Sequence, residues 1–321
     1  MAPYNKAVNA TFARKDGDIY VYRGEVDEEW VVAMVPNGGY ILGLILEAVV
    51  QQQAKTPHPD PIHVTAHFLK SAIVAPFEVH IRILKPGKGF CNLTANFVQD
   101  GVDKILTHMV LGTLAPRPGD QPDRTIAPPH PYAARTPMIT HPSKRMKVPA
   151  RRPWNYKHYI EVTHDPAYDE IAKGPTQGMK FGTYVTLSHP DDHITLPSMA
   201  LLADTFKIQI EVVPDFSEIM LHSWFPSMVM TIEFKFPIPK PTDPNYSSNT
   251  VAIYSEGKFI NDPNSRFDTY IEIWTAPEID EQEDEDWKEK QRCLAVATQM
   301  AIMVPIEVNR RRAQRPESTE L

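Results

Sequence analysis

A buried helix followed by four strands is predicted in the first half of this chain and again in the second half. The first helix is predicted at 41–54, a long apolar segment with almost no charge. Segments rich in β-branched and aromatic residues follow it at 62–70, 77–85, 91–99 and 104–114. The second half repeats the order, with a helical pattern at 196–210 and strands at 228–237, 250–258, 266–275 and 292–304. Two tandem copies of a helix covered by an antiparallel sheet predict an α+β fold.

Short segments of the two halves also correspond to each other. HVTAHFLK at 63–70 corresponds to VMTIEFKF at 229–236, and KILTHMVL at 104–111 corresponds to LAVATQMA at 294–301. We also expect His108 to occupy the place that Gln299 holds in the second half, which would make a second, degenerate site conceivable, although a structural histidine is the alternative. Two further strands are predicted before each helix, at 17–23 and 29–35 and at 157–163 and 180–187.

The chain is predicted to divide into an N-terminal unit at 1–115, a linker at 116–153 and a C-terminal unit at 154–321. The linker is rich in proline and shows no apolar period. The linker carries five basic residues: Lys144, Arg145, Lys147, Arg151 and Arg152. Such a cluster is typical of a solvated face; the alternative is that it contacts the phosphates of a nucleotide-bearing substrate. The second half differs from the first by an acidic insert at 278–291, which predicts an exposed, mobile loop.

The composition excludes several classes of protein. A net charge of −7 gives no overall attraction to nucleic acid, and no apolar run is long enough to span a membrane. The N-terminal residues lack the pattern of a secretory signal, and two distant cysteines suggest no disulfide framework and no metal site. We therefore expect a cytoplasmic protein; a peroxisomal one is the alternative, although the final residues STEL form no recognised address.

One charged residue lies in the second apolar helix. In TLPSMALLADTFKIQI at 195–210, Pro197 suits the first turn, and Asp204 lies at the edge of the apolar face. An aspartate in such a place needs either a partner or a chemical role. The alternative is a solvated or capping aspartate near the end of the helix.

These motifs together resemble the acyl-CoA thioesterase II-like family. The resemblance covers nearly the whole chain and depends on five segments: NGGY at 37–40, HVTAHFLKSA at 63–72, LPSMALLADTF at 196–206, PSMVMTIEFKFPIP from Pro226 and LAVATQMAIMV from Leu294. It implies a double hotdog fold, in which two tandem sheets each wrap a long helix. It also implies an acyl-thioester hydrolase that acts on acyl-CoA or an acyl carrier protein. No cofactor is implied beyond the coenzyme A of the substrate, and a homo-oligomer is expected by analogy.

The family resemblance assigns a catalytic set to this chain. It implies that Asp204, Ser227 and Gln299 hold the attacking water, with Ser227 in a position where the family has threonine. Thr231 is the alternative hydroxyl if the strand register differs by a few residues. Backbone N–H groups of Asn37, Gly38, Gly39 and Tyr40 are expected to bind the substrate oxygen, because they open a helix.

Two other functions remain open at this point. Hotdog folds also host thioester hydratases and dehydratases, which pair a histidine with a carboxylate, but no such pair is evident near the second helix. A polyketide-like ligand binder or cyclase is the other alternative, since the fold does not fix the function. A serine α/β-hydrolase is disfavoured because the chain has no G-x-S-x-G motif.

Overall fold

The computed structural model of the chain describes residues 2–115, 124–147, 154–171, 179–207, 222–280 and 282–314. Most of their strands form one large antiparallel sheet in the order β1-β2-β6-β7-β8-β5-β13-β17-β16-β14-β11-β10-β9, while β3 pairs with β4 and β12 with β18 in two small sheets. The sheet curves around two apolar helices, α2 and α4, and one buried cluster of apolar side chains spans both halves. The predicted double hotdog fold of the α+β class is therefore confirmed.

The elements of the first half follow the predicted order. They are α1 (Tyr4–Ala7), β1 (Thr11–Asp16), β2 (Ile19–Glu25), β3 (Val31–Val32), β4 (Val35–Pro36), α2 (Gly38–Gln53), β5 (Asp60–Phe68), β6 (Pro76–Pro86), β7 (Cys91–Gln99) and β8 (Val102–Gly112). The segment at 29–35 was predicted as one strand, and this is wrong: it forms two short strands joined through Ala33 at φ 55°. That left-handed residue reverses the chain just before α2.

The second half contains the corresponding elements and several short additions. They are η1 (Pro142–Lys144), β9 (Met146–Lys147), η2 (Asn155–His158), β10 (Ile160–His164), α3 (Pro166–Ile171), β11 (Met179–Leu187), α4 (Ser198–Ala203), β12 (Ser223–Trp224), β13 (Ser227–Phe234), β14 (Thr250–Gly257), β15 (Ile260–Asn261), β16 (Arg266–Thr275), α6 (Trp287–Lys290), β17 (Cys293–Ala301), β18 (Val304–Pro305) and α7 (Ile306–Gln314). None of the helices in the described ranges is long and apolar enough to cross a membrane.

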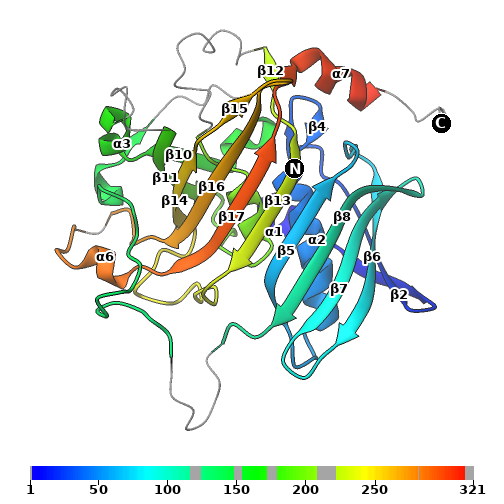
Figure 1. Cartoon of the computed structure of the whole chain (residues 1–321), viewed down its shortest axis with the longest axis horizontal. Coiled ribbons are helices and arrows are strands. Elements are labelled where there is room, and N and C mark those ends of the chain that lie inside the picture. The colour runs from blue at the N-terminus through cyan, green and yellow to red at the C-terminus, as the bar shows by residue number, and fades with distance from the viewer. Residues whose placement is uncertain are drawn as a thin grey trace.

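The two halves join through β5 and β13, which lie side by side at the centre of Figure 1. Thr65 pairs with Thr231 across this junction. These two residues also correspond to each other in the repeat, since HVTAHFLK aligns with VMTIEFKF. A residue that pairs with its own counterpart lies on an approximate two-fold axis, so the halves are related by rotation about this point.

Helix α2 begins three residues before its predicted start. Asn37 caps it, because its side-chain oxygen accepts the N–H of Tyr40 at 2.8 Å. Gly39 in the first turn lies directly against α4: a Cβ there would be 2.5 Å from the Ala200 carbonyl oxygen and 2.7 Å from the Asp204 Cβ. Glycine therefore allows the two central helices to approach at this crossing.

Helix α4 is shorter than predicted. It ends at Ala203, and the predicted residues 208–210 lie outside the described part of the chain. The N–H groups of Asp204 and Thr205 bond three residues back, to Leu201 and Leu202, which tightens the last turn. The Thr205 hydroxyl also donates a hydrogen bond to the Leu201 carbonyl oxygen at 2.8 Å. Asp204 is therefore the C-terminal cap rather than a residue inside a helix.

The acidic insert at 278–291 was predicted to be an exposed loop, but part of it is a helix with a buried side chain. Its helix α6 buries Trp287, which is 5% exposed, against Tyr184, Trp274 and Met138. Glu289 pairs with Arg135 at 2.5 Å, and Glu283 pairs with Lys144. The tryptophan anchors the charged segment to the second-half part of the sheet, near Cys293, where β17 begins.

Candidate active site

Asp204 projects from the end of α4 to the first turn of α2. Its Oδ2 accepts the Gly39 N–H at 3.0 Å and the Asn37 side-chain amide at 3.0 Å. The partial positive charge of a helix N-terminus favours a carboxylate at this position. Asp204 thus has partners from the other half of the molecule, so it is not simply a solvated aspartate, although it does lie at the C-terminal cap of α4, as the alternative allowed.

The second oxygen of Asp204 faces two adjacent strands. The Gln299 Nε2 on β17 lies 2.6 Å from Oδ1 and 2.6 Å from the Ser227 Oγ. The Ser227 hydroxyl on β13 donates to the same Oδ1 over a longer distance of 3.4 Å. Gln299 is 6% exposed between the buried Ala297 and Ala301, as strand alternation predicts. The structure therefore brings Asp204, Ser227 and Gln299 into mutual contact.

Two opposing effects act on the charge of Asp204. Burial raises the pKa of Asp204 above its usual range, whereas hydrogen bonds from Gly39, Gln299, Asn37 and Ser227 act to lower it. Asp204 is half-buried and lines a cavity. Burial is the larger effect, so this carboxylate binds a proton more readily than an exposed aspartate does.

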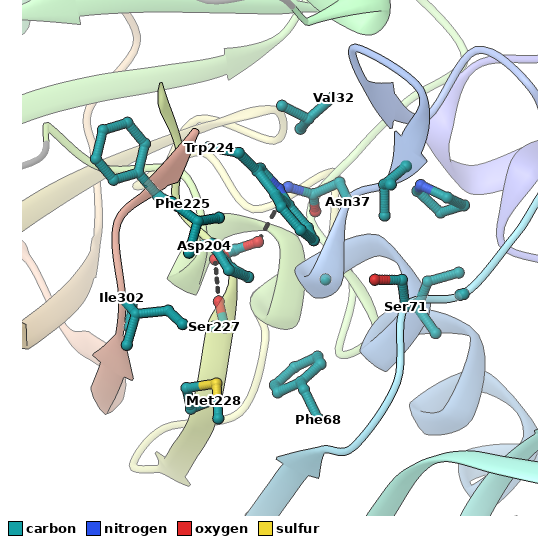
Figure 2. Close-up of a pocket in the computed structure, with 18 of the residues that line it drawn as sticks. Val32, Asn37, Phe68, Ser71, Asp204, Trp224, Phe225, Ser227, Met228 and Ile302 are labelled. Atoms are coloured by element: carbon teal, nitrogen blue, oxygen red, sulfur yellow. Dashed lines mark hydrogen bonds between the residues drawn. The ribbon is translucent and has the colours of Figure 1, made fainter. Parts of the chain in front are cut away.

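The site opens into a cavity of about 310 Å³ between the two halves. Figure 2 shows Asp204 in hydrogen-bond contact with Ser227, with Trp224, Phe225 and Ile302 from the second half and Phe68 from the first half around it. Most of the wall is apolar or aromatic, and one set of its polar groups, Asn37, Ser227 and Gln299, lies around Asp204. An apolar chamber with a few convergent polar groups is typical of a ligand site.

Thr231, the alternative hydroxyl, lies away from the cavity. Its side chain bonds Thr298 at 2.6 Å and does not line the cavity. A bulge between Ser227 and Val229 is the cause: one extra residue reverses the alternation, so Ser227 faces the site while Met230 and Ile232 point into the core.

The helix-opening residues divide into different roles. The Gly39 N–H is engaged by Asp204, and the Tyr40 N–H is engaged by its Asn37 cap. The Tyr40 hydroxyl contacts Ala7 and Asp27 away from the cavity, so the structure does not bring this side chain to the site. Gly38 lines the cavity, and its N–H donates to no group in the described ranges.

His108 does not occupy the counterpart position of Gln299, contrary to the expectation. Thr65 pairs with His108 as Thr231 pairs with Thr298, so His108 corresponds to Thr298. The counterpart of Gln299 is Met109, which is fully buried. The first half therefore lacks the amide that completes the polar cluster in the second half.

The basic linker residues lie elsewhere. Lys144 pairs with Glu283, Lys147 pairs with Glu161 at 2.8 Å, and neither they nor Arg145 line the cavity. Arg151 and Arg152 lie outside the described residues. Among those residues, no group of three or more histidine, cysteine, aspartate and glutamate side chains has an arrangement that could hold a metal ion.

Several residues of the site were missed in the sequence. Trp224 and Arg312 both line the cavity, from β12 and α7, and Phe68 lines it from the end of β5. The signal for Phe68 was present, because it lies within HVTAHFLKSA. Trp224 and Arg312 follow from the pairing of β12 with β18 and from the place of α7, which no local pattern encodes.

Comparison with known proteins finds similarity to thioesterases. Residues 26–113 match the family model of the acyl-CoA thioesterase N-terminal domain. The chain is 28% identical over 195 residues to the Ustilagic acid biosynthesis cluster protein orf2 of Mycosarcoma maydis, a match that covers 60% of this chain and 48% of that protein. The chain thus spans about half the length of this curated relative.

Solved structures with the same fold extend over nearly the whole chain. A proposed thioesterase II of Thermobifida fusca has a TM-score of 0.70 at 19% identity, covering 94% of this chain and 97% of its own. An acyl-CoA thioesterase II of Mycobacterium marinum has a TM-score of 0.64 at 15% identity, covering 94% and 98%. A hotdog protein of Alicyclobacillus acidocaldarius has a TM-score of 0.64 at 18% identity, covering 94% and 97%. The resemblance seen in the sequence is confirmed by the family match over residues 26–113 and by the shared fold.

Proposed function

We propose that this chain hydrolyses acyl thioesters by direct attack of a water molecule held by Asp204, Ser227 and Gln299. The observation that carries the proposal is the carboxylate of Asp204, fixed on both oxygens at the polar end of an apolar cavity. The family match over residues 26–113 supports an enzyme of the acyl-CoA thioesterase type. The substrate is an acyl-CoA or an acyl thioester carried on an acyl carrier protein.

The longest contact of Asp204 suggests where the water binds. Four donors fill the acceptor positions of the carboxylate, and the Ser227 hydroxyl is the most distant of them at 3.4 Å. A water that replaces this contact would bond both Ser227 and Asp204 Oδ1. Gln299, at 2.6 Å from each, would keep the two groups aligned around it.

The reaction then follows from the charges of the site. Asp204 takes a proton from the water as its oxygen bonds to the thioester carbon, and negative charge develops on the carbonyl oxygen. The Gly38 N–H, at the positive end of α2, is the donor available to that oxygen. As the tetrahedral carbon collapses, the carbon–sulfur bond breaks, and the thiolate leaves with the proton returned by Asp204.

The two alternative functions receive less support. A hydratase or dehydratase would pair a histidine with a carboxylate, but no histidine lines the cavity in the described part of the chain. A binder without hydrolysis has no need of a carboxylate whose burial is unfavourable, held by donors from three other elements.

Product analysis of the wild-type protein tests the proposal. The protein is incubated with saturated acyl-CoAs of increasing chain length and with 2,3-unsaturated acyl-CoAs, and thiol and acid are measured together. Hydrolysis predicts equal amounts of thiol and free acid. Addition of water to the unsaturated substrate without thiol release would instead identify a hydratase, and binding without turnover would identify a binder.

A further inference from the structure

The C-terminal helix α7 of the second half is fixed to the first half at the mouth of the cavity. Asn309 on this helix is fully buried, its Oδ1 accepts the Met34 N–H at 3.1 Å, and its amide donates to the Val32 carbonyl at 3.1 Å. These two bonds hold α7 to the β3–β4 hairpin. In Figure 1 the helix lies above β4, close to β12.

This docking places Arg312 at the cavity wall. Its guanidinium lies 5.5 Å from the centre of the Trp224 ring, and its Nη1 lies 3.4 Å from the Ser71 Oγ. Trp224 comes from the second half and Ser71 from the first, so Arg312 bridges the two sides of the mouth. Within the described ranges no ion pair of Arg312 is seen, and the residue is exposed.

The charge at this mouth is opposite to that of the whole chain. Lys70 and Arg312 line the cavity, and Asp204 is its single acidic lining residue in the described part, although the chain carries −7 overall. A cation stacked on tryptophan adds nothing to the binding of an apolar acyl chain. A guanidinium with free donors matches the geometry of a phosphate oxygen pair.

We propose that Arg312, with Ser71 and Lys70, binds a phosphate of the carrier to which the acyl group is attached. The inference rests on the proposed function and deepens it. The thioester carbonyl must reach Asp204 inside the cavity, so the carrier arm leaves through the mouth, where its phosphate meets Arg312. The shared chemistry is a phosphate ester, which occurs in coenzyme A and in the phosphopantetheine arm of an acyl carrier protein.

Kinetics with three substrates of one acyl group test this inference: the thioesters of coenzyme A, of phosphopantetheine and of pantetheine, which has no phosphate. Arg312→Ala is expected to raise KM for the phosphate-bearing substrates by about tenfold or more, since a hydrogen bond to a charged group is lost. The kcat, and the KM for acyl-pantetheine, should stay unchanged. Arg310→Ala is the matched control, because Arg310 is exposed on the same helix and does not line the cavity.

The three substrates also identify the phosphate. A loss shared by the coenzyme A and phosphopantetheine thioesters assigns the site to the phosphate on the arm, whereas a loss confined to coenzyme A assigns it to the nucleotide phosphates. An equal loss with acyl-pantetheine, or no loss with any substrate, would overturn the inference.

A binding measurement separates this inference from the proposed function. Free coenzyme A and pantetheine are titrated against wild type and Arg312→Ala, with tryptophan fluorescence as the readout. The inference predicts that the variant loses affinity for coenzyme A alone, whether or not the protein releases thiol. If all three thioesters remain intact, the proposed function fails, but the phosphate site is still tested by this titration.

Discussion

The position of Asp204 reflects a balance between burial and hydrogen bonding. Burial disfavours the charged carboxylate, and donors from α2, β13 and β17 compensate for part of that cost. A base needs both properties, because its charge must be retained in a water-poor site and its pKa must be high enough to accept a proton. The raised pKa of Asp204 agrees with this role and has two measurable consequences.

The first consequence is the pH dependence of hydrolysis. Asp204 must be ionised to act as the base, so kcat/KM should rise with pH through the pKa of Asp204 in the free enzyme. Because burial raises this pKa, the acidic limb should lie above the value of about 3.9 of an ordinary aspartate. A rate profile in buffers of constant ionic strength measures it. A limb at or below that value would contradict burial as the dominant effect.

The second consequence is the pH dependence of stability. The folded state holds the Asp204 proton more tightly than the unfolded state, so this group stabilises the fold below its unfolded pKa. The contribution is lost as pH rises through the folded pKa. Denaturant unfolding of wild type and Asp204→Asn should show the wild type losing free energy of unfolding relative to the variant over this range. Parallel curves for the two proteins would refute the raised pKa.

Substitutions at Ser227 test its hydroxyl. Ser227→Ala removes the group that would share the water with Asp204 and should lower kcat/KM by about tenfold to hundredfold. Ser227→Thr keeps the hydroxyl that the family resemblance places here, and it should stay within a few-fold of wild type. Steady-state kinetics on one acyl-CoA provide the comparison. If Ser227→Ala were as active as the wild type, Ser227 would have no part in the mechanism.

At the scale of elements, the sequence predicted the helices and strands whose apolar residues recur with a regular period. The apolar segment at 41–54 and the strand at 91–99 agree with α2 and β7, because burial imposes their patterns directly. The bulge after Ser227 could not be predicted, since one extra residue changes the facing of Thr231 without changing the composition of β13. Trp287 was likewise hidden in a segment whose charge suggested solvent.

Some residues of the candidate site could likewise be predicted from the sequence, and others could not. Asp204 and Gln299 were found through their apolar neighbours and the family resemblance, and the structure brings them together. The mouth residues Trp224 and Arg312 were missed, because their place depends on the docking of α7 on the β3–β4 hairpin. Contacts between distant elements leave no local periodicity.

The crossing of α2 and α4 is tested at Gly39. A methyl group there would meet the Ala200 carbonyl and the Asp204 Cβ, so Gly39→Ala should cost about 1–3 kcal/mol of unfolding free energy and displace the carboxylate. The matched control is Gly38→Ala, whose nearest neighbour is the edge of the Phe68 ring at 3.2 Å. Thermal and denaturant unfolding measure both variants. Equal stability of the two variants would contradict the close helix crossing.

At the scale of the whole molecule, residues of both halves form the polar site. Asn37 and Gly38 come from the first half, and Asp204, Ser227 and Gln299 come from the second half. The related position in the first half has Met109 instead of the amide. The second half therefore supplies Asp204 with Ser227 and Gln299, and the first half supplies the N-terminus of α2, which holds the carboxylate.

The shared sheet predicts that both halves unfold together. The pairing of β5 with β13 and the common core leave no boundary at which one half can separate cleanly. Hydrogen exchange of peptides from β6–β7 and from β14–β16 should therefore show one common denaturant midpoint. Two separate midpoints would show that the halves are independent units.

The most direct measurement of the central claim is kcat/KM of Asp204→Asn against wild type on one acyl-CoA that the wild type hydrolyses. Asparagine keeps the shape of the side chain and can still accept from Gly39 and Asn37, so the fold should persist by circular dichroism. Loss of the base predicts a decrease of about 10²- to 10⁴-fold. A folded variant that retains activity within about threefold of wild type, well short of the loss of a general base, would show that water activation does not depend on Asp204.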